Sequence, residues 1–170
     1  GLDYYRLDMD SIEKQRVAFI DQINLANEIG KPLMLHVRPH EDENKDTSIP
    51  RAYIDAYKII KEHAKVRGNV HFFAGNVDEA KNFWEVGFTT SFTGVITFTN
   101  DYDEVVKTAP DGLIHAETDA PYVTPVPYRG QRNEPMHVRE VVKRQAEIRG
   151  VSEEKWQEQL LKNAHDLYAI

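Results

Sequence analysis

The chain has 170 residues, a formal net charge of −7 and no cysteine, with 41% hydrophobic and 29% charged residues. These values fit one globular domain over residues 1–170 and exclude both a disulfide framework and thiolate chemistry. No apolar run approaches the ~18 residues that cross a bilayer, so we expect a cytoplasmic protein. The acidic charge argues against nonspecific coating of nucleic acid, but not against a nuclease that binds phosphate through cations and local arginines.

Signals for strands and helices alternate along the chain. Short apolar runs predict buried strands at 33–37, 70–74, 88–92 and 113–117. Helical periodicity and capping signals predict helices at 11–29, 50–66, 77–86, 101–108, 136–149 and 152–168. Ser11 is the expected N-cap of the first helix, and residues 95–98 fit either a further short strand or a loop. Successive β-α units predict an α/β fold with a parallel sheet and right-handed crossovers.

Three side chains that can bind a metal lie in or just after expected strands, namely His36, His71 and Asp119. The carboxyl ends of parallel strands form the active-site face of β/α barrels. A shared site for a divalent ion explains all three polar groups together, since imidazole and carboxylate suit hydrolytic metals. Alternatively, each histidine is hydrogen-bonded in the core and Asp119 caps a helix or pairs in a loop. Glu117 shares a face with Asp119 and either supports a ligand or pairs with an arginine.

The loop 118–135 contains four prolines and presents charged side chains beside the expected site. Arg129 and Arg132 are candidates for phosphate binding, because the guanidinium fork matches phosphate oxygens. Alternatively, the two arginines pair with Glu134 to fix the loop, and Glu134 is also a candidate to support a metal ligand. Tyr122 either stacks on a nucleic-acid base or packs against the protein.

Six strings, in order along essentially the whole chain, resemble the TatD family of metal-dependent deoxyribonucleases. They are 1–6 (Gly-Leu-Asp-Tyr-Tyr-Arg), 35–38 (Leu-His-Val-Arg), 71–75 (His-Phe-Phe-Ala-Gly), 91–94 (Ser-Phe-Thr-Gly), 117–122 (Glu-Thr-Asp-Ala-Pro-Tyr) and 129–135 (Arg-Gly-Gln-Arg-Asn-Glu-Pro). The last two strings are the most specific.

The resemblance implies a TIM-type (β/α) barrel with a centre of two divalent ions, either Mg, Mn or Zn. It implies hydrolysis of phosphodiester bonds in DNA, commonly as a 3′ to 5′ exonuclease. His36 and His71 resemble ligands of one metal. Asp119 resembles a ligand of the other metal and a catalytic residue that orients or deprotonates the attacking water.

The sequence also departs from the family pattern. Family members begin with a strand that carries a His-x-His pair, and they carry a bridging glutamate two residues before the Gly-Leu-Asp string. This chain starts at that glycine, Gly1, and a TIM barrel typically needs ~250 residues. We therefore expect an incomplete barrel that lacks its first strands and has little nuclease activity alone. Its open sheet edges predict self-association or binding of a complementary N-terminal segment.

Two other functions remain open from the sequence. A barrel of this type can also hydrolyse another substrate, such as an amide or an ester, because the fold does not fix the substrate. From a different class, the chain is a non-catalytic fragment, such as one half of a split protein. An α/β domain without any site leaves His36, His71 and Asp119 without a shared explanation.

Overall fold

The structure is a computed structural model that describes residues 1–5, 9–43 and 45–170. Arg6 of the first family string and Asn44 of the loop after residue 38 lie outside the described residues. The strands are β1 (Leu2–Asp3), β2 (Leu33–Arg38), β3 (Gly68–His71), β4 (Thr89–Phe92) and β5 (Ile114–Ala116). All neighbouring strands are parallel, and their order across the sheet is their order along the chain. This arrangement confirms the predicted α/β fold with a parallel sheet.

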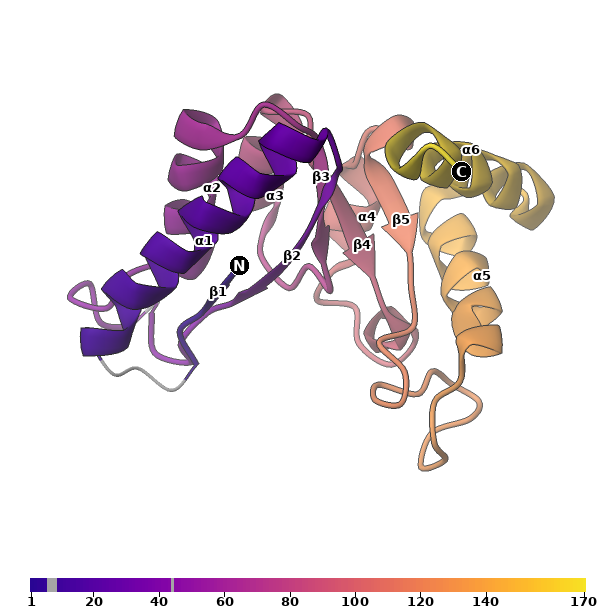
Figure 1. Ribbon diagram of the computed structural model, residues 1–170. Helices are drawn as coiled ribbons and strands as arrows, with labels where there is room; N and C mark the ends of the chain where they lie inside the picture. Colours follow the sequence, from indigo (N-terminus) through magenta and orange to yellow (C-terminus); the bar gives the residue numbers. More distant parts are fainter. Residues whose placement is uncertain (6–8, 44) are drawn as a thin grey trace.

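Helices cover one side of the curved sheet. They are α1 (Met9–Ile29), α2 (Ala52–His63), α3 (Val77–Glu85), α4 (Asp103–Thr108), α5 (Val138–Arg149) and α6 (Glu153–Tyr168). Three short 3-10 helices are η1 (Gly94–Thr97), η2 (Asp111–Leu113) and η3 (Pro135–His137). Figure 1 shows the sheet as an arch, with α1 and α2 along one flank and α5 and α6 along the other. Within the described residues, no helix has the length and apolar character that a bilayer span requires.

Three expected boundaries are corrected by the structure. The first helix already includes Met9, so Ser11 lies inside α1 and is not its N-cap. The strand expected at 70–74 ends at His71, because Phe72 adopts a left-handed backbone conformation with φ 46°. Residues 95–98 are neither a strand nor a plain loop, since most of them belong to η1.

The apolar core lies between the helices and the outer face of the sheet. In β2, Leu35 and Val37 are buried whereas Met34 is 63% exposed, so the strand turns alternate side chains to the core and away from it. Below the end of β3, Phe73 is fully buried and its ring centroid lies 4.9 Å from that of Tyr53. Tyr53 Oη accepts a hydrogen bond of 2.8 Å from the Ala74 backbone N–H. The core therefore fixes the backbone immediately after β3.

The inner face of the sheet is polar instead. Asn69 and Thr89 are in register on β3 and β4, so their side chains share this face, and Thr89 Oγ1 donates to Asn69 Oδ1 over 2.9 Å. Asn69 Nδ2 in turn donates to Ser91 Oγ over 2.8 Å. All three residues are buried. Because each of these three side chains finds a partner, the ladder satisfies buried polar atoms at the centre of the sheet.

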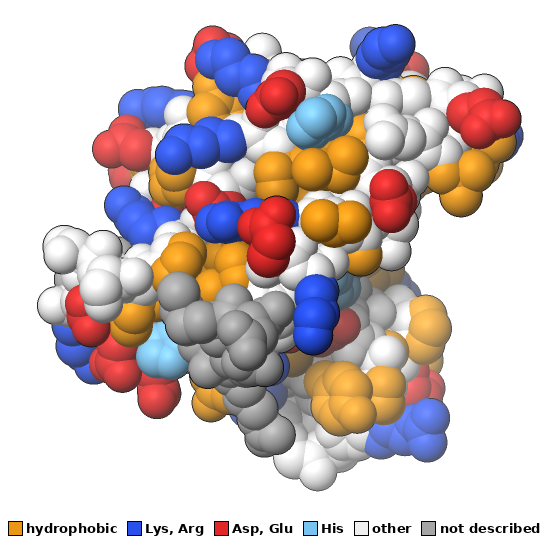
Figure 2. Space-filling view, turned by 60° about the vertical axis from the view of Figure 1, so that its left-hand side comes forward, with side chains coloured by type: hydrophobic (Ala, Val, Ile, Leu, Met, Phe, Trp, Pro, Cys, Tyr) orange, Lys and Arg blue, Asp and Glu red, His pale blue; other side chains and the backbone are white. Residues whose placement is uncertain are grey.

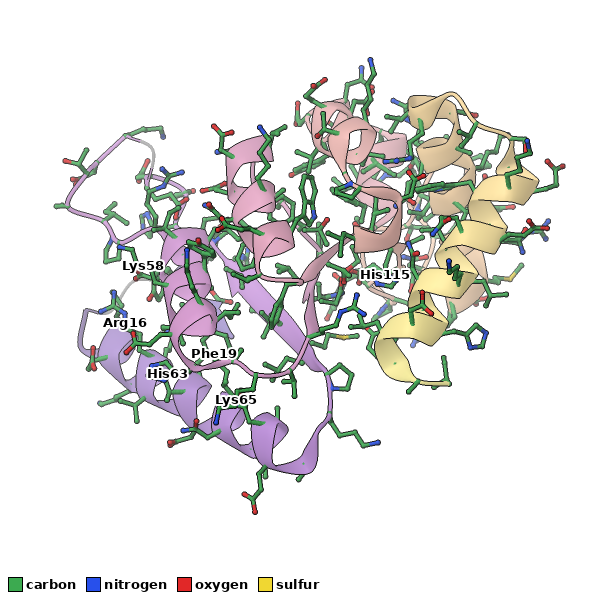
Figure 3. All side chains as sticks on the ribbon, turned by 90° about the horizontal axis from the view of Figure 1, so that it is seen from above. Arg16, Phe19, Lys58, His63, Lys65 and His115 are labelled. Carbon is green, nitrogen blue, oxygen red and sulfur yellow. The ribbon has the colours of Figure 1, made fainter. Side chains whose placement is uncertain are left out.

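His115 lies on the same inner face, in register with Ser91. Its side chain is buried and its ring centroid lies 6.2 Å from that of Tyr168 at the end of α6; Figure 3 shows His115 beside that helix. His115 Nε2 has no hydrogen-bond partner within the described part of the chain. Burial, aided by the charge of Arg67 and opposed by that of Glu117, lowers the pKa of His115 to about 4.

We expect His115 to make the fold sensitive to acid between about pH 6.5 and pH 4. The unfolded imidazole binds a proton near pH 6.5, whereas the folded one binds it only near pH 4. Protonation therefore favours unfolding across this window, by roughly 2–3 kcal/mol at about pH 4.5, and the effect is absent at about pH 7.5. Urea unfolding at both pH values measures this loss in the wild type and in His115→Leu. Equal losses in the two proteins would contradict the prediction.

Candidate metal centre

The three predicted ligands line one cavity at the carboxyl ends of β2 and β3. The cavity has a volume of about 330 Å³, and His36, His71 and Asp119 all contribute to its wall together with Arg38 and the backbone around Phe72. His36 and His71 are in register on neighbouring strands, whereas Asp119 comes from the loop after β5. The parallel sheet thus brings together residues that lie up to 83 positions apart in the sequence, from His36 to Asp119.

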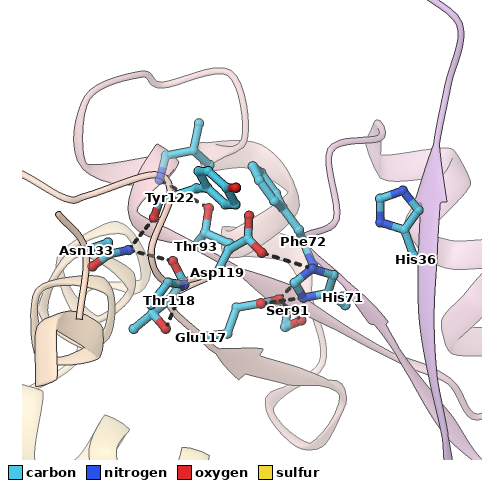
Figure 4. A network of polar contacts seen from close by, with 12 residues as sticks. His36, His71, Phe72, Ser91, Thr93, Glu117, Thr118, Asp119, Tyr122 and Asn133 are labelled. Atoms are coloured by element: carbon cyan, nitrogen blue, oxygen red, sulfur yellow. Dashed lines mark hydrogen bonds and ion pairs between the residues drawn. The ribbon is translucent and has the colours of Figure 1, made fainter. Parts of the chain in front are cut away.

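His71 lies between two carboxylates. Its Nδ1 is 2.5 Å from Glu117 Oε2, and its Nε2 is 3.4 Å from Asp119 Oδ1. Figure 4 shows the imidazole ring between the two acidic side chains. The hydrogen bond that His71 donates to Glu117 raises the pKa of His71, burial lowers it, and the charges of both carboxylates raise it, so the pKa lies above its ordinary value.

Glu117, which follows β5, accepts hydrogen bonds from β4 and from the turn after β3. Its Oε1 accepts from the Phe72 backbone N–H over 2.7 Å and from Ser91 Oγ. Burial raises the pKa of Glu117, but the hydrogen bonds from His71, Ser91 and Phe72 outweigh burial and leave it below its ordinary value. Glu117 therefore remains a charged acceptor, and the alternative that it pairs with an arginine is not what the structure shows.

Asp119 is presented by a tight turn. Its φ of 52° lies in the left-handed region, which aspartate tolerates better than most residues. The Asp119 carbonyl accepts from the Tyr122 N–H over 2.9 Å, which closes the turn. Burial raises the pKa of Asp119, and the charge of Glu117 raises it further, while the histidines oppose these effects. A nearby cation would therefore favour its charged form.

His36 lies apart from this cluster, as Figure 4 shows. Its side chain is 58% exposed, and its Nε2 is 3.0 Å from Asp3 Oδ2 of β1. Among the residues that the structure describes, no three His, Asp or Glu side chains are close enough together to bind one ion. The three predicted ligands share a cavity but do not converge on a point within it.

The donor chemistry nevertheless fits a divalent ion. Two imidazoles and one carboxylate are ligands that zinc and manganese accept. A metal-binding histidine usually donates its second ring N–H to a carboxylate, which fixes the tautomer. His71 has this arrangement, because Glu117 holds Nδ1 while Nε2 faces Asp119. The chemistry of these residues therefore fits one part of a metal site.

The loop residues are placed differently from one another. Arg129 stacks over Phe98 with Cζ 4.0 Å from the ring centroid and donates to the Thr124 carbonyl over 2.8 Å. It therefore fixes the loop, though not through Glu134 as the alternative supposed. Arg132 is exposed, and the Tyr122 side chain is 70% exposed beside the cavity. Glu134 is exposed at the start of η3 and does not line the cavity, so its predicted support of a ligand has no counterpart in the geometry.

Sequence reasoning missed Asn133, which organises the loop. Asn133 is 2% exposed, and its Nδ2 donates to the carbonyls of Thr118 and Tyr122 over 2.7 and 2.6 Å. These two carbonyls bracket Asp119, so Asn133 fixes the turn that presents the carboxylate. The sequence shows only an asparagine in a proline-rich loop, and nothing in its spacing reveals contacts over 15 residues.

The fold is part of a parallel β/α barrel, and the cavity with the candidate ligands lies at the carboxyl ends of its strands. The chain belongs to the family described as TatD related DNase, whose pattern matches residues 1–169. This match confirms the resemblance seen in the sequence motifs.

Relatives and solved structures support the assignment. The uncharacterized metal-dependent hydrolase YabD of Bacillus subtilis is 35% identical over an alignment of 174 positions, which covers 100% of this chain and 63% of YabD. The uncharacterized metal-dependent hydrolase YcfH of Escherichia coli is 31% identical over 91% of this chain and 55% of YcfH. The crystal structure of YJJV, a TatD homolog from Escherichia coli, matches with a TM-score of 0.79 and 25% identity over 100% of this chain and 62% of that one. The likeness confirms the TIM-type fold, of which this chain spans less than two thirds.

We expect Asn133→Ala to destabilise the protein by roughly 2–4 kcal/mol. The substitution leaves the part-buried carbonyls of Thr118 and Tyr122 without their donor, and each such loss costs about 1–3 kcal/mol. Urea unfolding followed by circular dichroism measures the change. The neighbouring exposed Gln131→Ala is the matched control and should change stability by less than about 0.5 kcal/mol. Similar stability of Asn133→Ala and the control would contradict the role of Asn133.

Proposed function

We propose that this chain forms part of a metal-dependent hydrolase that cleaves phosphodiester bonds in DNA as a 3′ to 5′ exonuclease. The observation that carries the proposal is the position of His71 between Glu117 and Asp119, in a chain of the TatD related DNase family. The relatives named above are described as metal-dependent hydrolases. We further propose two divalent ions, Mg, Mn or Zn, per complete site, and a cytoplasmic location.

On this proposal each residue of the site has a separate role. His36 and His71 would bind one ion, and Asp119 would bind the other. Such ions would supply the positive charge that polarises a phosphate. Glu117 keeps the proton of His71 on Nδ1, so that the lone pair of Nε2 faces the cavity. The carboxylate of Asp119 orients the attacking water and accepts its proton.

On this proposal the substrate is bound by individual side chains near the site and not by a large positively charged surface. Figure 2 shows acidic, basic and hydrophobic side chains interspersed on one face of the molecule, in keeping with the net charge of −7. Arg132 and Tyr122 are exposed on the loop that carries Asp119 and are available to a phosphate and a base. The outer edges of β1 and β5 pair with no further strand among the described residues. We therefore propose self-association or a complementary N-terminal segment as partner.

We expect calorimetric titration with Mn²⁺ or Zn²⁺ to show binding that His71→Ala abolishes. Glu117→Gln keeps the shape of the side chain but loses its charge, and it should weaken binding by about 10–100-fold. His165→Ala is the control, because His165 is exposed at the end of α6, away from the cavity. Circular dichroism verifies that each variant is folded. Equal binding by the wild type and His71→Ala, or no binding by the wild type, would overturn the proposed centre.

We expect the chain alone to have little or no nuclease activity with Mn²⁺. Its candidate ligands do not converge on one point within the described residues, so transition-state charge would be poorly stabilised. Degradation of 3′-labelled single-stranded DNA, followed on a gel, measures the activity. A parallel screen with ester and amide substrates tests the other barrel chemistries. Robust metal-dependent degradation that disappears in His36→Ala would contradict the expectation.

A further inference from the structure

A second cavity adjoins the candidate metal centre. It has a volume of about 540 Å³, within the roughly 300–1,000 Å³ that ligand sites usually have. The two cavities share Arg38, Pro39 and Ala74 in their walls. A ligand can therefore extend from the metal centre into the second cavity past the side chain of Arg38.

Arg38 is held in a defined orientation between the cavities. Its Cζ lies 3.8 Å from the centroid of the Tyr5 ring, so the guanidinium is stacked on the aromatic face. It follows His36 by two residues on β2, and both side chains are exposed on the inner face. Within the described part of the chain, the guanidinium pairs with no carboxylate. A stacked guanidinium keeps its in-plane N–H groups free for an anion.

The second cavity has different chemistry from the first. Tyr5, Tyr53 and Tyr102 line it together with the carboxylates of Glu43 and Glu79. Both carboxylates are buried, at 7% and 6% exposure, and Arg51 neutralises Glu79 over 2.7 Å. Tyr53 is 1% exposed and packs against Phe73, so the rings of Tyr5 and Tyr102 are those that suit a nucleobase. Carboxylate oxygens accept hydrogen bonds from amino and hydroxyl groups. This wall does not suit a phosphate, which therefore belongs on the side of Arg38.

We propose that Arg38 binds a phosphate of the substrate at the boundary between the cavities, and that the second cavity holds the attached nucleoside. The carboxylates favour a base with an exocyclic amino group. This inference rests on the proposed function in taking the substrate to be a nucleic acid. It adds the residue that recognises the phosphate and the place of the nucleoside next to it.

The test uses dCMP as the probe, in EDTA, so that no metal contributes. Two-dimensional NMR titration of the whole chain measures the affinity for dCMP, deoxycytidine and inorganic phosphate. The wild type should bind dCMP more tightly than either part. Arg38→Gln should weaken dCMP binding by about tenfold, because the charge-assisted hydrogen bonds of the guanidinium are lost. The affinity for deoxycytidine should stay unchanged. Arg139→Gln, which removes the same charge from an exposed position on α5, is the matched control and should bind like the wild type.

The nucleoside half of the inference has its own variant. Tyr102→Ala should weaken dCMP and deoxycytidine alike and leave inorganic phosphate unchanged. Equal dCMP affinity in the wild type and Arg38→Gln would overturn the phosphate role. A loss of dCMP affinity in Arg139→Gln as large as that in Arg38→Gln would also overturn it, because it would show only general charge attraction. Metal binding and hydrolysis are absent from this assay. If the chain binds no metal or has no nuclease activity, the nucleotide titration can therefore still be interpreted. Conversely, a chain that does not bind dCMP does not contradict the proposed metal centre.

Discussion

The candidate site depends on the half-buried carboxylate of Glu117. A carboxylate removed from water must be hydrogen-bonded, because an unpaired buried charge costs several kcal/mol. Glu117 meets this requirement by accepting from His71, Ser91 and the backbone N–H of Phe72. These partners belong to two neighbouring strands and the turn after one of them. The left-handed turn at Phe72 and the orientation of His71 are thus fixed by the same acceptor.

The two faces of the sheet serve different purposes. On the outer face, apolar residues such as Leu35 and Phe73 pack against helices and supply most of the stability. On the inner face, Thr89, Asn69 and Ser91 form a hydrogen-bonded ladder that ends at Glu117. A catalytic group needs support of this kind, since a ligand held by a rigid partner is already in its working geometry. The ladder connects the centre of the sheet to the metal centre.

The alternation along β2 gives one strand two tasks in substrate chemistry. His36 and Arg38 both emerge on the inner face, so a candidate metal ligand and the arginine proposed to bind phosphate lie one strand repeat apart. His36 now faces Asp3, whereas Arg38 is fixed by Tyr5. Asp3 belongs to the short strand β1, and Tyr5 follows that strand by two residues. The first residues of the chain therefore orient the inner face of β2 and also contribute Leu2 and Tyr4 to the buried core.

The sequence by itself determined the alternation of strands and helices, the parallel sheet and the identity of the metal-binding candidates. These features follow from local periodicity and from polar residues in apolar runs, which neighbouring residues suffice to specify. Only the tertiary structure decided that Glu117 pairs with His71, that Arg129 stabilises its own loop and that Asn133 fixes the turn at Asp119. Such contacts depend on strand register and on the path of a long loop. No local pattern encodes them, because packing across the whole sheet sets which distant side chains meet.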